Sequence, residues 1–197
     1  TRVKPFKSIM YNELELAEKF GVDIVAFNLA EAVNDLKEIY DTKQTELNGE
    51  LIALKNTFDC GSLSDEYLKK MLCIVHYYEN LAKANDCNII SGECWTGISL
   101  GWGANPCLAM CLLADKDVYV TCEWDIHMTI TNVLLLSATR GKEKPIQGEF
   151  TCRHPENDNA ELLWHCGPFP LKYKAPGEKP WLYNTKPSFR LKDGEYT

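Results

Sequence analysis

The stretch "DVYVTCEWDIHMTITN", residues 117–132, decides the fold expected for this chain. Its first half predicts a buried strand, and a buried helix is predicted to follow over 125–139. A strand that passes directly into a helix is the repeating unit of α/β proteins. The junction carries Glu123, Asp125 and His127, which either cap the helix or hold a ligand.

The same alternation is expected upstream. "FKSIMYNELELAEKFGVDIVAFN", residues 6–28, predicts a strand at 6–10, a helix stopped by Gly21, and a strand in "VDIVAF". This is a βαβ unit, which implies a parallel sheet. Further helices are predicted over 30–41, 63–86 and 104–114, and further strands in "CNIISGE" and "DVYVTCE". The predicted fold class is therefore α/β, with a parallel, Rossmann-like sheet and flanking helices.

The sequence pattern changes after "TRGKEKP", residues 139–145, from alternating strands and helices to short strand-like segments. Short strand-like pieces, "PIQGEF", "AELLWHC", "WLYN" and "SFRL", are separated by Pro, Gly and Asn, as at the start of a mainly β domain. The sequence predicts an α/β domain over 1–142 and a partial β-rich C-terminal domain over 143–197. Asp193-Gly194 is a hairpin signal with three residues after it, from which we expect the chain to be a fragment cut at both ends.

Composition excludes several classes of partner. The net charge of −7 and the pI of about 5.2 disfavour nucleic acid and anionic lipid, which need basic patches. No run of 18 apolar residues is present, so no membrane span is expected, and no signal peptide is apparent. Nine cysteines without a CxxC pair indicate buried thiols in a reducing, cytoplasmic compartment.

Polar groups follow two of the predicted strands, in "SGECW" at 91–95 and "CEWD" at 122–125. Ligands collect at the carboxyl ends of parallel strands. Glu93 and Asp125 are separated by one βαβ period and are expected on the same rim, where two carboxylates near an imidazole suit Mg²⁺ or Mn²⁺. The alternative is structural: Glu123 or Asp125 caps the helix, Glu93 is a loop residue, and His127 is a core or capping histidine.

A second polar cluster lies in "GEFTCRHPENDNAELLWHCGPFP", residues 148–170. Arg153, His154 and Asn157 are good partners for hydroxyl groups, although loops of this composition are usually solvated. Trp95 near the rim, like Trp102 and Trp124, could stack on a sugar or simply pack in the core.

His165 and Cys166 suggest a Cys–His nucleophile. Neighbouring residues in a strand point to opposite faces, which disfavours that interpretation.

The segments "ECWTGISLGWGANPCLAMCLLADKDVYVTCEWDIHMTITNVLLLSAT" (93–139) and "GEFTCRHPENDNAELLWHCGPFP" resemble the L-fucose isomerase family and, more loosely, the L-arabinose isomerases. The opening 29 residues are similar to the second α/β domain of those proteins. The resemblance implies an aldose–ketose isomerase that uses a divalent metal, usually Mn²⁺, to stabilise an enediolate while acidic groups move a proton between carbons. It also implies a monosaccharide substrate and a homo-oligomer when the protein is intact.

The resemblance assigns the metal-binding Asp of the family to Asp125. The family's metal Glu would fall just after Cys94-Trp95, where this chain has Thr96 and Gly97. Glu93 is the expected substitute, and the third ligand, a histidine, is expected beyond Thr197. We therefore expect this fragment alone to be inactive. The missing Glu also leaves open a non-catalytic sugar-binding or regulatory homologue, and a third alternative is a structural subunit whose α/β face mediates assembly.

Overall fold

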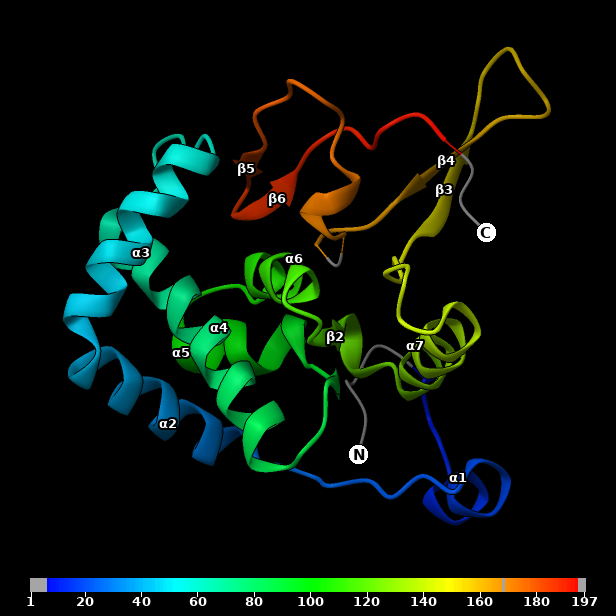
Figure 1. Cartoon of the computed structure of the whole chain (residues 1–197), viewed down its shortest axis with the longest axis horizontal. Helices are drawn as coiled ribbons and strands as arrows, with labels where there is room; N and C mark the ends of the chain where they lie inside the picture. The colour runs from blue at the N-terminus through cyan, green and yellow to red at the C-terminus, as the bar shows by residue number, and fades with distance from the viewer. Residues whose placement is uncertain (1–6, 168, 195–197) are drawn as a thin grey trace.

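The computed structural model describes residues 7–167 and 169–194, including every side chain in these ranges except that of Trp95. Helices dominate the first two thirds, and short strands dominate the remainder (Figure 1). The elements are α1 (Glu13–Phe20), α2 (Leu29–Thr42), α3 (Gln44–Thr57), α4 (Asp65–Ala84), β1 (Ile89–Ser91), the π-helical turn η1 (Cys94–Ile98), α5 (Ser99–Trp102), α6 (Cys107–Asp115), β2 (Tyr119–Thr121), the 3₁₀ turn η2 (Cys122–Trp124), α7 (Ile126–Thr139), β3 (Glu149–Arg153), β4 (Glu161–Trp164), the 3₁₀ turn η3 (Leu171–Tyr173), β5 (Trp181–Tyr183) and β6 (Lys186–Ser188).

Local signals set the ends of the predicted helices. The Ser64 side chain accepts a hydrogen bond from the Tyr67 amide and caps α4, and Gly21 ends α1 in the left-handed conformation at φ 64°. The structure confirms the five helices predicted from the sequence, which are α1, α2, α4, α6 and α7. Helix α3 was missed, although its buried residues Leu47, Leu51 and Leu54 keep helical spacing.

Strands β1 and β2 are parallel neighbours, with Ile89 opposite Tyr119 and Ser91 opposite Thr121. This confirms an α/β arrangement and the predicted pairing of these two strands. The strands predicted at 6–10 and in "VDIVAF" are wrong for the residues described. Residues 7–9 form a bend and turn, and residues 22–28 are extended without a strand partner. Val25 and Phe27 are exposed, so this segment has no neighbouring strand to bury it. The N-terminal βαβ unit is therefore not formed, and the parallel sheet of the described residues has two strands rather than the width of a Rossmann fold.

Helix α4 forms the centre of the core and contacts α2, α3 and α6 (Figure 1). Its apolar positions are buried on several sides because these helices surround it. The fully buried members include Leu68, Met71, Cys73 and Ile74, with Leu36, Leu47 and Leu108 from the neighbouring helices. This packed helical layer supports the β1–β2 sheet from which the site is built.

The remainder contains two antiparallel hairpins, β3–β4 and β5–β6, with the turn η3 between them. The β5–β6 hairpin contacts α6, and Leu182 donates its backbone N–H to Asp59 beyond α3. The division of the chain at residue 142 stays a prediction. The returning strand predicted after Gly194 lies outside the described residues.

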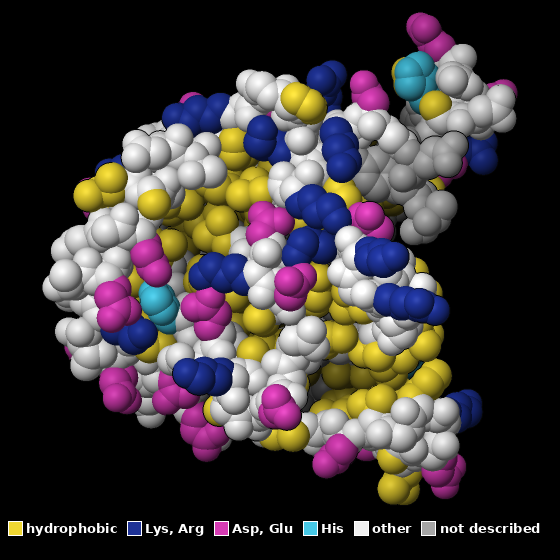
Figure 2. Space-filling view, in the orientation of Figure 1, with side chains coloured by type: hydrophobic (Ala, Val, Ile, Leu, Met, Phe, Trp, Pro, Cys, Tyr) yellow, Lys and Arg dark blue, Asp and Glu magenta, His cyan; other side chains and the backbone are white. Residues whose placement is uncertain are grey.

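Hydrophobic side chains lie at the surface around α7 and α1 (Figure 2), among them Leu14, which is 76% exposed, and Leu134, which is 55% exposed. Among the described residues no single helix has both the length and the apolar character to cross a membrane. One pair bent by 107°, Thr96–Trp102 with Cys107–Asp115, meets that requirement only when the two helices are taken together.

Candidate metal and sugar site

The turn between β2 and α7 has an unusual backbone. Glu123 and Trp124 are consecutive non-glycine residues in the left-handed region, at φ 64° and φ 60°. Such residues cost on the order of 1 kcal/mol or more each, and they cluster at functional sites because surrounding contacts must enforce them. This turn therefore marks a place where geometry is maintained against local preference.

Three hydrogen bonds fix the turn. The Cys122 amide donates to Oε1 of the buried Gln147 at 2.9 Å, and the Trp124 amide donates to the Gly92 carbonyl at 3.0 Å. The Asp125 amide donates to the Cys122 carbonyl at 3.2 Å. The turn that presents Glu123 is thus tied both to the end of β1 and to the segment that leads into β3.

The β3–β4 hairpin brings its two outer ends together. Its register places Glu149, the first residue of β3, opposite Trp164, the last residue of β4, and His165 follows directly. The chain then passes very close to α6: a Cβ atom on Gly167 would lie 2.7 Å from Cys107 Cβ and 2.9 Å from the Cys107 carbonyl oxygen. Only glycine allows this approach, so the position of His165 depends on Gly167.

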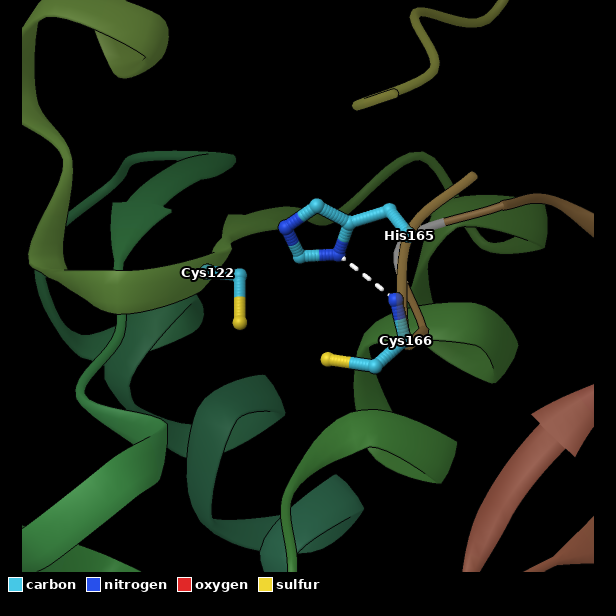
Figure 3. A group of neighbouring side chains, drawn as sticks. All are labelled: Cys122, His165 and Cys166. Carbon is cyan, nitrogen blue, oxygen red and sulfur yellow. Dashed lines mark hydrogen bonds between the residues drawn. The ribbon is translucent and has the colours of Figure 1, made fainter. Parts of the chain in front are cut away.

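Two sets of potential ligands meet at His165. In the first, a carboxylate oxygen of Glu123, a carboxylate oxygen of Glu149 and a ring nitrogen of His165 all lie within 4.8 Å of one another. In the second, the sulfurs of Cys122 and Cys166 and a ring nitrogen of His165 meet the same limit (Figure 3). The first set suits a hard or borderline divalent cation, whereas the second suits a thiophilic one.

The charges around His165 alter its protonation and that of its neighbours. Burial lowers the pKa of His165, but the Cys166 side chain and the carboxylates of Glu149 and Glu123 raise it more, so the net pKa is above its ordinary value. Hydrogen bonding from Cys107 and then from Cys122 lowers the pKa of the Cys166 thiol against the effect of burial. The same hydrogen bonds, together with burial, raise the pKa of Cys107 and of Cys122, so within this group the contacts favour negative charge on Cys166.

The Cys166 amide donates to Nδ1 of His165 at 2.9 Å. In a neutral imidazole this hydrogen bond leaves the ring proton on Nε2, which points away from the Cys166 backbone (Figure 3). A cation at Nε2 requires the ring proton on Nδ1. Cation binding would therefore exchange the hydrogen bond from Cys166 for a metal–nitrogen bond.

The two carboxylates singled out from the sequence have local partners. Asp125 Oδ1 accepts from the Met128 amide at 2.9 Å, so Asp125 is the N-cap of α7. Glu93 accepts from the Thr96 hydroxyl at 2.8 Å and lies over Gly97. In the described part of the chain, neither residue belongs to a group of three or more neighbouring metal ligands.

The residues expected to bind hydroxyl groups lie elsewhere. Arg153, His154 and Asn157 are on the exposed turn of the β3–β4 hairpin, where Arg153 Nε lies 3.7 Å from Glu161. The Trp95 side chain lies outside the described residues. Trp102 is a core residue whose indole donates to the Lys70 carbonyl.

The expectation that His165 and Cys166 point to opposite faces is wrong. Strand β4 ends at Trp164, so the alternation of a strand does not extend to these two residues, and their side chains converge (Figure 3). His127, in contrast, is exposed, and its Nε2 lies 3.2 Å from the Met10 carbonyl oxygen.

A cavity of about 500 Å³ opens beside His165. Its size falls in the range of small-molecule sites. The lining is aromatic with a few polar groups and includes Trp164, Phe169, Trp181, Tyr183, Ser188 and Arg190. Aromatic faces of this kind can pack against the apolar faces of a sugar, and of the carboxylate–imidazole group it is His165 that lines the cavity.

Sequence reasoning left Glu149 unnoticed and gave no metal-binding role to His165. The available signal was the succession of two predicted strand-like pieces, "PIQGEF" and "AELLWHC", since consecutive strands of a β-rich segment commonly pair as a hairpin. An antiparallel pair joins the start of its first strand to the end of its second, which brings Glu149 beside His165.

Comparisons with known proteins point to sugar isomerases. Over 156 residues the chain is 26% identical to proteins named sulfoquinovose isomerase from Priestia aryabhattai and from Priestia megaterium (strain ATCC 12872 / QMB1551). Each match covers 79% of this chain and 34% of the relative. A sulfoquinovose isomerase from Alkalicoccus urumqiensis is 30% identical over 112 residues, covering 53% of this chain and 25% of the relative. No protein-family model matches the chain.

These similarities support a relationship to sugar isomerases and do not single out the L-fucose isomerase family expected from the sequence. The chain spans about a third of the length of the first two relatives.

Proposed function

We propose that this chain carries part of the active site of a metal-dependent aldose–ketose isomerase. The observation that supports the proposal most is the meeting of Glu123, Glu149 and His165, with their ligand atoms within 4.8 Å of one another, beside a cavity of monosaccharide size. Similarity to sulfoquinovose isomerases supports the same class of reaction. The substrate class is a monosaccharide, and sulfoquinovose is the first candidate to test.

The donor set fits a cation of the Mn²⁺ or Mg²⁺ class. Two carboxylates and one imidazole provide hard oxygen ligands with one borderline nitrogen, a combination that Mn²⁺ accepts readily. When bound, such an ion acts as a Lewis acid that polarises sugar oxygens. Glu123, Glu149 and His165 would hold it, and a further ligand from outside this chain is consistent with the relatives being longer.

The protein groups also provide a route for the proton. Isomerisation of an aldose moves a proton from the second carbon to the first and the hydroxyl proton from the second oxygen to the first, and a carboxylate that takes and returns the carbon-bound proton serves as both base and acid. Glu149 is exposed at the start of β3, whereas Glu123 is partly buried in the strained turn. One carboxylate oxygen of Glu149 belongs to the ligand set, and we assign the proton transfer to its other oxygen, because Glu149 is more accessible to a sugar than Glu123 is.

The experiment is an isomerase assay of the full-length protein with Mn²⁺ and a panel of aldoses that includes sulfoquinovose. We expect ketose formation that stops on chelation of the metal and in Glu149→Gln. Asp125→Asn is the matched control, since it changes an acid two residues from Glu123 while keeping an oxygen that can cap α7. Activity in this control should persist.

Saturable sugar binding without ketose formation would contradict the proposal and favour the non-catalytic sugar-binding homologue. Loss of activity in Asp125→Asn with full activity in Glu149→Gln would instead favour the rim formed by Glu93 and Asp125.

A further inference from the structure

Cysteines also gather around His165. Cys122 and Cys166 flank the ring, and each has one more thiol beside it. The sulfurs of Cys122 and Cys94 lie 3.1 Å apart, and those of Cys166 and Cys107 lie 4.0 Å apart. All four are free cysteines. The proposed isomerase chemistry uses none of them.

The four thiols come from segments far apart in the sequence. Cys94 follows β1, Cys122 follows β2, Cys107 begins α6, and Cys166 follows β4. Four elements converge on one point because β1 and β2 are paired and Gly167 allows the Cys166 segment to lie on α6. The arrangement is therefore a product of the tertiary fold and not of one local motif.

We propose that Cys122, Cys166 and His165 form a second metal site, for a thiophilic cation such as Zn²⁺, which shares its imidazole with the carboxylate set. Zinc holds thiolate sulfur at about 2.3 Å and imidazole nitrogen at about 2.0–2.1 Å, so ligand atoms around one ion lie roughly 3.5–3.8 Å apart. The three ligand atoms already lie within 4.8 Å of one another, so side-chain movements of about an ångström or less complete the site.

Burial favours a soft ion here. Cys122 is 0% exposed and His165 is 6% exposed, and Cys166 is partly exposed. Thiolate ligands prefer zinc, cadmium or copper(I) over manganese or magnesium. Cys94 is the nearest additional sulfur, next to Cys122, and is the candidate for a fourth ligand. His165, the imidazole ligand, lines the cavity.

Sharing His165 has a direct consequence, which rests on the proposed function: a second cation at the same imidazole would be repelled by the charge of the first, and a ring nitrogen bound to one ion cannot serve another. Occupation of the thiolate site should therefore weaken occupation of the carboxylate site, and the reverse. Because the thiols must lose their protons, affinity for the soft ion should rise with pH.

Cadmium titration of the full 197-residue chain tests this site. We expect one equivalent of Cd²⁺ to produce a thiolate-to-metal charge-transfer band in the ultraviolet. Affinity should fall on the order of tenfold or more in Cys122→Ala, Cys166→Ala and His165→Ala. The matched control is Cys111→Ala, which removes a buried α6 thiol outside the group and should bind Cd²⁺ as the wild type does.

A measurement on the unaltered chain covers the case in which a variant fails to fold. X-ray absorption of the zinc-loaded wild type should show at least two sulfur ligands and one nitrogen. A shell of oxygen and nitrogen alone would overturn the proposal, as would wild-type Cd²⁺ affinity in Cys166→Ala. Neither result would contradict the proposed carboxylate site, because Mn²⁺ binding depends on Glu123 and Glu149 and is measured separately.

Discussion

The side-chain oxygen of Gln147 accepts a hydrogen bond from the backbone amide of Cys122 at 2.9 Å. This contact joins the segment before β3 to the turn after β2, and the carboxylates of Glu149 and Glu123 follow these two residues in the chain. Both partners are buried. This hydrogen bond therefore ties together the two segments that carry the carboxylates.

Replacing Gln147 with leucine should leave the buried Cys122 amide without a partner. The expected loss in the free energy of unfolding is about 1–3 kcal/mol, because an unsatisfied buried donor costs its full desolvation penalty. Urea denaturation measures it. Asn159→Ala, on the exposed β3–β4 turn, is the control and should change stability by less than about 0.5 kcal/mol. An equal effect in both variants would remove the special role given to this contact.

Gly167→Ala should move the His165 segment away from α6. The added Cβ would lie 2.7 Å from Cys107 Cβ and 2.9 Å from its carbonyl oxygen, so backbone must shift, at a cost of about 1–3 kcal/mol in unfolding free energy. We also expect weaker Mn²⁺ and Cd²⁺ binding. Gly49→Ala in α3, where nothing lies within 4 Å of the new atom, should be neutral or stabilising. Unchanged metal binding in Gly167→Ala would argue against a site at His165.

Asp125→Ala should remove the N-cap of α7 and lower the free energy of unfolding by about 0.5–2 kcal/mol. Asp125→Asn keeps a capping oxygen and should restore most of this loss. Thermal unfolding of the two variants checks the assignment. If Asp125→Asn is as unstable as Asp125→Ala, the charge of Asp125 matters for more than capping.

The Asp117 carboxylate should make the free energy of unfolding depend on pH in the acid range. Hydrogen bonds from Lys144 at 2.6 Å and from the Tyr119 hydroxyl at 2.9 Å lower its pKa below the ordinary value. Because its pKa is lower in the folded than in the unfolded state, ionised Asp117 stabilises the fold at pH values above the unfolded-state pKa of about 3.9. This stabilisation is lost as the pH falls through the folded-state pKa.

Asp117→Asn should thus be less stable than the wild type at neutral pH, and the difference should shrink below about pH 4. Because Asp117 is largely exposed, we expect a difference under about 1 kcal/mol. Denaturant midpoints of both proteins across acid pH measure it. A difference that is constant with pH would mean that the ion pair is not its cause.

Local sequence predicted the helices well. Ser64 with the apolar spacing behind it is enough to define α4, and Gly21 is enough to end α1. The prediction of a strand in "VDIVAF" was wrong because a strand needs a neighbouring strand to pair with. The apolar pattern of Val25 and Phe27 does not show whether such a neighbour exists, and among the described residues this segment has none.

The candidate site was harder to predict, for a physical reason. The capping role of Asp125 competes with a ligand role, and both use the same residue type at the same place. Glu123 adopts a left-handed conformation, and the sequence has no glycine at this position to indicate it. Glu149 and His165 meet through hairpin pairing and through the close approach at Gly167, which are long-range features.

Calorimetric titration of Mn²⁺ into the wild-type chain, Glu123→Gln, Glu149→Gln and Asp125→Asn would decide whether the two glutamates with His165 hold a cation. We expect saturable binding by the wild type and by Asp125→Asn, with affinity reduced on the order of tenfold or more in both glutamate variants. Wild-type affinity in Glu123→Gln and Glu149→Gln, with loss of binding confined to Asp125→Asn, would contradict it.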